Sequence, residues 1–388
     1  MVLQLIQGLF NGLSIGSVLL VVALGLAIVF GLMGVINLAH GELMMLGAYT
    51  TFVVQNTFRP LGEPVFSFYI FAALPMAFLV AALVGLALER GVIRFLYGRP
   101  LETLLATWGV SLILRQFVRS VNGSLALSLG VFCLLFFGAW VILSRLRRDW
   151  SELRNRVLWG VGILSGAIAF FTHKVLDSNP TFSTLWFSAR NVDVTAPPWL
   201  RGGIPLGNFQ LPYARIFIIV LTLICVVGIY WFLNRSNWGL RIRAVTQNRN
   251  MSACLGIPTD RVDALTFALG SGLAGVAGVA IALLGSVGPN TGQNYIVDAF
   301  MVVVVGGVGN LFGTIIAAMA IGIVTYLIGS GTIAALLLPI DALKPVTEFF
   351  LFFATTSMAK VMVFALIIAF LQFKPAGIFA PKGRTAEL

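Results

Sequence analysis

The stretch NRSNWGLRIRAVTQNRNMSACLGIPTDRVD, Asn234–Asp263, separates two long apolar runs that are almost free of charge. It contains five arginines and only two acids, Asp260 and Asp263. Basic loops between membrane-spanning segments lie on the cytoplasmic side. The stretch therefore predicts a cytoplasmic loop, although an ordinary loop that only fixes topology would carry the same charge pattern.

The inner part of this loop is predicted to form a short amphipathic helix. Thr246 or Asn248 is a suitable N-cap, and Gly256 followed by Pro258 would end the helix. A short amphipathic helix in a cytoplasmic loop indicates a docking surface. The residues that share one of its faces at i, i+3, i+4 spacing are Met251, Cys254 and Leu255.

The run Trp238–Gly278, WGLRIRAVTQNRNMSACLGIPTDRVDALTFALGSGLAGVAG, resembles the signature loop of the branched-chain amino acid permease family of ABC importers. In that family a cytoplasmic coupling helix inserts into a cleft on a separate ATPase subunit. The resemblance implies that Gln247–Leu255 is the coupling helix. The coupling residues that it implies are Gln247, Asn248, Arg249, Asn250, Met251, Ala253, Leu255 and Gly256.

The composition is that of a polytopic membrane protein. Of the 388 residues, 59% are hydrophobic and 10% are charged, whereas soluble proteins have about 25% charged residues. The net charge of +11 is better explained by cytoplasmic loops than by nucleic-acid binding. Three cysteines without CxxC spacing indicate neither a disulfide framework nor a metal site. No basic residue precedes Arg59, so we expect the first apolar run to be a retained span.

We expect an all-α protein with about ten or eleven transmembrane helices that form one permease domain over residues 1–388. The segment Thr332–Phe353, broken by Pro339 and Pro345, is predicted to hold a further tilted or re-entrant piece. The predicted spans are Gly8–Gly31, Leu38–Val54, Phe66–Ile93, Leu101–Val121, Leu125–Leu143, Val157–Thr172, Ile216–Leu233, Ala264–Leu284, Ile296–Leu311, Ile315–Ile328 and Met358–Phe373.

Basic loops predict the orientation in a bacterial inner membrane. Alternation between these loops places the polar segment Asp177–Pro212 outside, together with the uncharged amino terminus. The loops expected in the cytoplasm are those with Arg94 and Arg99, the cluster Arg145–Arg156, the coupling loop at 234–263, and the tail with Lys374, Lys382 and Arg384.

Residues 122–186 are expected to be an inserted transmembrane hairpin. In relatives, a run resembling RPLETLLATWGVSLILRQFVRSV (Arg99–Val121) leads almost directly into one resembling FSARNVDVTAPPWL (Phe187–Leu200), whereas here two apolar segments intervene. A hairpin returns to the side that it left, so the core topology is preserved. The insertion is either a peripheral segment that faces lipid or a docking site for a regulator or another subunit.

The second span begins with INLAHGELMMLGAYT, which places Asn37, His40 and Glu42 at or within the membrane. Ionisable residues there indicate a functional site, although Asn37 could also simply cap the helix start. His40 and Glu42 are two residues apart and cannot share a helix face, which argues against a paired acid–base site. The three residues match an N-x-AHG-E hallmark of the family, and this resemblance implies packing or a place along the solute pathway.

Small residues four apart predict close helix packing, either within a dense bundle or at a dimer contact. The pairs are Gly12 with Gly16, Ser271 with Gly275, Ala274 with Gly278, and Gly309 with Gly313.

The polar cluster GSVGPNTGQNYIVDAFMVVVVGGVGNLFGT, Gly285–Thr314, contains no G-x-x-x-x-G-K-[ST] motif, so nucleotide binding is not expected in this chain. Its amides, with Pro289, indicate either an external turn or a broken segment at membrane depth that lines a wet cavity. The residues predicted to line the solute path here are Asn290, Thr291, Gln293, Asn294 and Asp298.

The chemistry of this cluster bears on the solute. A zwitterion favours charged partners at both ends, whereas here Asp298 is the only charge near the amides, which favours urea. The cluster, RPLETLLATWG and FSARNVDVTAPPWL also resemble the urea-type permease subunit of the family more than the branched-chain amino acid type. That resemblance implies a second, different permease, two ATPases that bind ATP, an external urea-binding protein and no cofactor on this chain.

Three classes of function follow. The first is a permease subunit of an ABC importer, for urea or alternatively for branched-chain amino acids. The second is a passive channel or secondary transporter for a small neutral solute. The third, an intramembrane enzyme, is disfavoured because the sequence has no H-E-x-x-H, no Asp-Asp pair and no G-x-S-x-G.

Overall fold

The computed structural model describes residues 2–146, 150–179, 183–187, 190–206, 209–338 and 344–379. The chain divides into two compact units, one of residues 1–112 with 192–388 and one of residues 113–191. Pro339, Lys382 and Arg384 of the sequence predictions lie outside the described ranges, as do residues 147–149 of the predicted basic cluster.

The fold is all-α apart from one short hairpin of β1 (Gly203–Leu206) and β2 (Phe209–Pro212), which confirms the predicted class. The helices are α1 (Val2–Met33), α2 (His40–Phe58), α3 (Glu63–Phe66), α4 (Tyr69–Gly91), α5 (Pro100–Ser120), α6 (Gly123–Leu146), α7 (Trp150–Asp177), α9 (Tyr213–Arg235), α10 (Asn237–Gln247), α11 (Arg249–Cys254), α12 (Thr259–Leu284), α13 (Thr291–Gly306), α14 (Leu311–Gly329), α15 (Thr332–Leu337), α16 (Lys344–Phe352) and α17 (Thr356–Phe373).

Eight helices of the described residues are long and apolar enough to cross a membrane: α1, α4, α6, α7, α9, α12, α14 and α17. The shorter or more polar α2, α5 and α13 occupy the other three predicted spans. The segment Thr332–Phe353 forms the two short helices α15 and α16.

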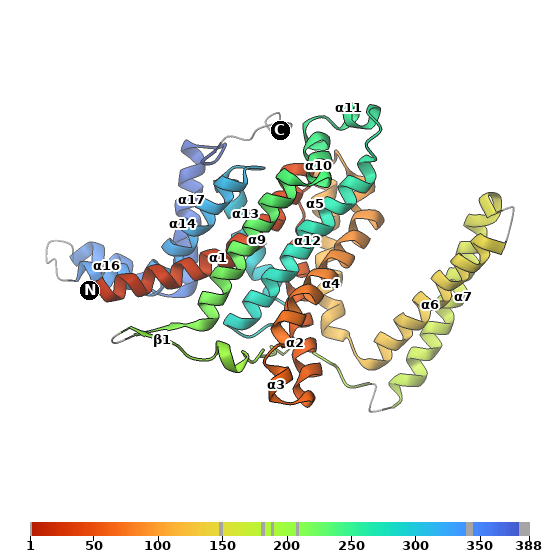
Figure 1. Cartoon of the computed structure of the whole chain (residues 1–388), viewed down its shortest axis with the longest axis horizontal. Helices are drawn as coiled ribbons and strands as arrows, with labels where there is room; N and C mark the ends of the chain where they lie inside the picture. Colours follow the sequence, from red (N-terminus) through yellow and green to blue (C-terminus); the bar gives the residue numbers. More distant parts are fainter. Residues whose placement is uncertain are drawn as a thin grey trace. The chain divides into compact units, whose positions relative to one another are not determined.

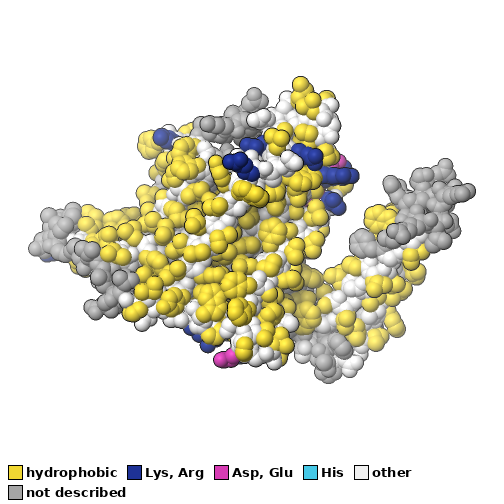
Figure 2. Space-filling model, in the orientation of Figure 1, with side chains coloured by type: hydrophobic (Ala, Val, Ile, Leu, Met, Phe, Trp, Pro, Cys, Tyr) yellow, Lys and Arg dark blue, Asp and Glu magenta, His cyan; other side chains and the backbone are white. Residues whose placement is uncertain are grey.

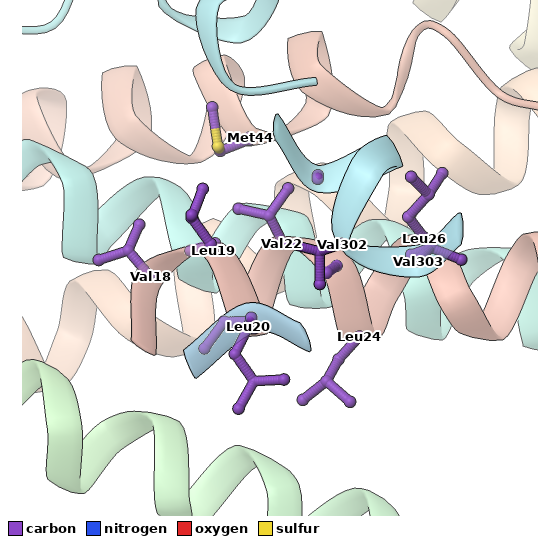
Figure 3. Close-up of a cluster of buried hydrophobic side chains, with 14 of the residues drawn as sticks. Val18, Leu19, Leu20, Val22, Leu24, Leu26, Met44, Val302 and Val303 are labelled. Carbon is purple, nitrogen blue, oxygen red and sulfur yellow. The ribbon is translucent and has the colours of Figure 1, made fainter. Parts of the chain in front are cut away.

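The core of the first unit is built around α1, which is apolar on all sides. Over its most apolar window, 83% of the residues are buried, as expected for a helix surrounded by other helices. It packs against α9, α12, α13 and α14. Figure 3 shows Leu19 and Val22 leaving one side of α1, toward Met44 of α2, and Leu24 leaving the opposite side.

The helices α1 and α12 have similar surroundings within the bundle. The main neighbours of α1 are α14 and α12, and those of α12 are α4, α2 and α1. Each of the two helices leads into a helix that begins inside the bundle, α1 into α2 and α12 into α13. The two interior helices meet at Gly41 and Gly292, where a Cβ on either residue would overlap the backbone of the other.

The small residues that are four apart pack within this bundle and do not leave a free face. Gly12 and Gly16 lie against Ile323 and Ala318 of α14, and Gly275 lies against Ala77 of α4. The sequence left open a dense bundle or a dimer contact, and here the close contacts lie within the chain's own bundle.

The first unit has two ends of different character (Figure 1). The helices α10 and α11 lie at one end, and α3 with the β1–β2 hairpin lies at the other. Lys and Arg side chains gather at the α10 end (Figure 2). By the positive-inside rule we expect this end to be cytoplasmic, and the hairpin, part of the segment predicted to be external, lies opposite.

In the second unit, α6 and α7 pack against each other. Asn122 begins α6 by accepting a hydrogen bond at Oδ1 from the backbone N–H of Leu125, at 2.8 Å. Ser124 donates from Oγ to Asp177 Oδ1 at 3.3 Å and so joins the start of α6 to the end of α7. These two helices cover most of residues 122–186, whose status as an insertion stays a prediction.

Candidate functional site

The helix α11 presents apolar side chains to solvent. Met251 is 60% exposed and Leu255 is 76% exposed, whereas Ser252 is buried against the protein. A cytoplasmic helix normally buries its apolar residues, so this face is chemically suited to a partner protein. The exposed face is the one predicted from the i, i+3, i+4 spacing.

Local sequence fixes both ends of α11. Asn248 is the N-cap, and its Oδ1 accepts from the backbone N–H of Met251 at 2.9 Å. At the other end Gly256 has φ +82°, and the N–H of Ile257 donates to the carbonyl of Ser252, which closes the helix. The predicted range Gln247–Leu255 was too long at its start, because α10 continues through Thr246 and Gln247 until Asn248 breaks the helix.

Arg249, the first residue of α11, anchors it to α12. Its guanidinium lies 2.8 Å from Oδ2 of Asp263, whose side chain is only 7% exposed. It also lies 5.1 Å from the ring centre of Tyr97, a cation–π contact. Because both contacts use one rigid planar group, α11 is held at a fixed distance from α12 and from the α4–α5 connection.

The α4–α5 connection carries the rest of this anchor. The Tyr97 hydroxyl donates to Glu89 Oε1 at 3.1 Å, and Arg94 pairs with Asp260 at the start of α12. Burial, together with the negative charge of Asp263, raises the pKa of Tyr97, so its hydroxyl remains a donor. We call Arg94, Glu89, Tyr97, Arg249 and Asp263 the anchor cluster.

The polar residues at the start of α2 lie in the middle of the bundle. His40 Nε2 is 3.2 Å from the carbonyl oxygen of Val22, near the centre of α1. Glu42 Oε1 accepts from Ser111 Oγ of α5 at 3.0 Å. The two side chains therefore point to different helices, as their spacing predicts. The N-cap is Ala39, and Asn37 Oδ1 accepts from its N–H, so Asn37 stabilises the turn before the helix.

The second predicted polar cluster covers a break between two helices and the first turns of α13. Residues 285–290 form the non-helical connection between α12 and α13, and α13 begins at Thr291. Thr291 is buried and its Oγ1 accepts from the N–H of Gly288 at 2.8 Å, which fixes the start of the helix. Its close contact with α2 at Gly292 explains why this helix begins inside the bundle.

One face of α13 is polar and exposed. Asn290, Gln293 and Asn294 share this face at i, i+3, i+4 spacing, and we call them the α13 stripe. The next residue on the face, Val297, is exposed but apolar. Because Gly292 packs on Gly41, and the neighbouring His40 contacts Val22 of α1, we expect these amides to lie at membrane depth. Amides exposed to lipid are unfavourable, so this face is suited to water, a solute or another protein.

At the edge of the stripe, Asp298 forms an ion pair with Lys360 of α17. The Lys360 Nζ lies 2.6 Å from Asp298 Oδ2 and 3.4 Å from the backbone oxygen of Asn294. The side chain of Asp298 is 10% exposed, whereas that of Lys360 is 35% exposed. Charged residues inside a membrane bundle usually mark a pathway, and they usually pair with one another.

The structure divides the predicted path residues into two groups. Glu42 lies near Gly292 on the side of α13 that faces α2, whereas Asp298 faces α17 and the amides face outward. Lys360, Tyr97 and Glu89 were missed by sequence reasoning. The available signal was that each is a charged or polar residue next to or within an otherwise apolar run.

Comparison with known proteins decides the family. The sequence model described as "Branched-chain amino acid transport system / permease component" matches residues 8–149 and 153–371. This chain belongs to the branched-chain amino acid transport permease family. It is therefore a multi-pass transport subunit of the bacterial inner membrane, of the ABC importer type.

Relatives cover nearly the whole chain. It is 26% identical to the high-affinity branched-chain amino acid transport system permease protein LivH of Escherichia coli, over 97% of this chain and 96% of the relative. It is also 26% identical to BraD of Pseudomonas aeruginosa, a permease of the same description, over 82% and 84%. No solved structure matches the chain.

Proposed function

We propose that this chain is the membrane gate of an ATP-driven importer whose ATPases are separate subunits docking on α11. The observation that carries the proposal is the exposed apolar pair Met251 and Leu255 on a helix that is capped at both ends. The anchor cluster supports it, because a push on α11 reaches α12 through Asp263 and the α4–α5 connection through Tyr97. We expect two ATPases and a second, different permease in the complete importer.

We propose that the solute path follows the α13 stripe and that the second permease covers it. Exposed amides at membrane depth, beside a charged pair, are suited to a wet path between two permeases. Glu42 and Ser111 lie on the other side of Gly292 and would line an inner part of the same path. The second permease would also remove the amides from contact with lipid.

The charges along this path favour a zwitterionic amino acid. From sequence, Asp298 is the only charge near the amides, which favoured urea. Lys360 is 62 residues away in sequence but lies 2.6 Å from Asp298. The pair therefore provides one group for an ammonium and one for a carboxylate. The branched-chain amino acid transport of LivH and BraD agrees with this chemistry, so we propose branched-chain amino acids as the solute.

Urea is the second candidate. Its support is the resemblance of the α13 region and of RPLETLLATWG to urea-type permeases, together with the neutral amides of the stripe. Each amide can both donate to a urea carbonyl and accept from a urea N–H. An external binding protein for the solute is expected in either case.

The test is uptake by the complete importer, with its binding protein, in sealed vesicles supplied with ATP at the cytoplasmic face. Labelled leucine and labelled urea are offered separately and in competition. We expect ATP-dependent accumulation of leucine, with no effect of excess urea. Accumulation of urea that leucine does not inhibit would establish the second candidate. ATP-independent equilibration of either solute would contradict the importer itself.

A further inference from the structure

A cavity of about 390 Å³ lies between α9 and α14, both of which pack against α1. Its volume is within the range of small-molecule sites. Deeper in the bundle it is bounded by Leu24 of α1, and its walls are Val226 and Ile229 of α9 with Phe312 and Ile315 of α14. The lining is therefore mainly aliphatic and aromatic, which suits a hydrocarbon chain better than a polar solute.

Among the residues that the structure describes, polar side chains line the cavity toward its cytoplasmic end. Asn234 lies at the end of α9, and Asn310 is the N-cap of α14. Both residues line the cavity beside Tyr230, whose side chain is 66% exposed. The cavity thus runs from an apolar interior to a polar opening at the cytoplasmic surface, the same order of polarity as an acyl chain with its headgroup.

The opening is basic. Arg243 donates from Nη1 to Asn234 Oδ1 at 3.2 Å, which holds its guanidinium beside the cavity. Arg235 and Arg241 are exposed nearby in sequence, and Arg241 stacks over Trp238 at 5.0 Å, an arrangement common at the membrane interface. No acidic residue occurs in the sequence between Asp193 and Asp260, so the α9–α10 corner has no carboxylate of its own.

We propose that this cavity binds an anionic phospholipid of the cytoplasmic leaflet, with an acyl chain between α9 and α14 and the phosphate beside Arg243. Basic pockets between transmembrane helices on the cytoplasmic side are suited to anionic headgroups. Figure 2 shows hydrophobic side chains over α9, with Lys and Arg gathered at the α10 end. The site is separate from α11 and from the α13 stripe, so lipid binding here can be tested independently of the proposed transport cycle.

The lipid would also stabilise the α9–α10 corner, which leads directly into α11. An occupied cavity keeps α9 and α14 apart and holds Asn234 and Arg243 together. Because α10 packs on α9 and α12 and leads into α11, a headgroup bound at this corner would stabilise the position of the coupling helix.

The test is photolabelling of the full chain in nanodiscs of phosphatidylcholine. A trace of phosphatidylglycerol with a diazirine on its acyl chain is compared with the matching phosphatidylcholine probe, and labelled peptides are mapped by mass spectrometry. We expect the anionic probe to label peptides at Val226–Tyr230 and Leu311–Ile315 several-fold more strongly. One basic side chain near a membrane is worth on the order of fivefold in affinity for an anionic lipid, so Arg243→Gln should reduce the preference by about that factor.

Matched controls separate this site from general contact with lipid. Arg261→Gln removes an exposed cytoplasmic charge elsewhere and should leave the preference unchanged. Ile315→Trp should fill the cavity and abolish labelling by both probes, whereas Ile224→Trp, on the exposed face of α9 outside the lining, should not. Equal labelling by both probes, labelling spread evenly along α9, or an unchanged preference in Arg243→Gln would each overturn the proposal.

Discussion

Two helices, α11 and α13, each expose side chains whose polarity does not match their surroundings. At the cytoplasmic end, α11 presents Met251 and Leu255 to water. At membrane depth, α13 presents Gln293 and Asn294 where lipid would otherwise lie. The mismatch has opposite chemistry in the two places, and this difference indicates two different partners.

An apolar face in water is suited to a protein that buries it, and the free energy comes from removing apolar area from water. A polar face at membrane depth is suited to a wet path or to a polar surface of a partner. We therefore assign the motor to α11 and the solute to α13. The following predictions test this division, beginning with the largest expected effect.

The double substitution Met251→Asp with Leu255→Asp should abolish ATP-driven uptake. Two exposed apolar anchors at the centre of an interface are each worth about 2 kcal/mol, so removing both should weaken ATPase binding on the order of a thousandfold. The measurements are uptake in vesicles and co-purification of the ATPase. Leu240→Asp, also exposed but on α10, is the control and should retain both. Normal uptake by the double variant would remove α11 as the docking site.

Asp298→Asn should reduce uptake by more than an order of magnitude and should also destabilise the chain, because it leaves the Lys360 charge without its carboxylate. The loss of stability should be on the order of 2 kcal/mol, below that of a fully buried pair since the Lys360 side chain is 35% exposed. Thermal unfolding in detergent and uptake are measured together. Asp298→Asn with Lys360→Met should recover stability without recovering leucine uptake. Recovery of uptake as well would mean that the pair is only structural.

Gln293→Leu with Asn294→Leu should reduce uptake several-fold while leaving ATPase binding intact. The change removes polar groups from the α13 stripe without disturbing buried Gly292 or Asp298. Val297→Leu, on the same face, is the matched control. If both variants transport normally, the stripe is a contact with lipid or with a partner and the path lies elsewhere.

Arg249→Lys should have the smallest effect, a loss of about fivefold in solute moved per ATP hydrolysed. Lysine keeps the charge beside Asp263 but loses the planar contact with Tyr97, which is worth on the order of 1 kcal/mol. ATPase binding should be unchanged, because Arg249 lies at the protein side of α11. Arg261→Lys is the control, and equal coupling ratios in the two variants would show that the anchor cluster transmits nothing.

Sequence was sufficient where the cause is local. Hydrophobic runs located the helices, and Gly256 located the end of α11, because a cap depends only on its neighbours in the chain. For the start of α11, Asn248 was one of two caps that the sequence offered. At α13 the sequence left open a turn or a broken segment, and it did not predict where the helix begins. There the helix is stabilised by Gly292 packing on Gly41, a contact between residues far apart in the sequence.

The partners of buried charges were also beyond the sequence. Asp298 was recognised as unusual, but nothing near it in the chain indicates Lys360. The same holds for Arg249 and Tyr97, which belong to different loops. Such pairs are set by how whole helices pack, and in this case the missing partner changed the favoured solute from a neutral amide to a zwitterion.

The most direct test of the central claim compares the chain alone with the complete importer in sealed vesicles. Labelled leucine is supplied outside with its binding protein, and ATP is supplied at the cytoplasmic face. The account predicts that the complete importer concentrates the solute only with ATP and that the isolated chain neither concentrates it nor hydrolyses ATP. Accumulation against a gradient by the isolated chain would contradict a gate that is driven by separate subunits.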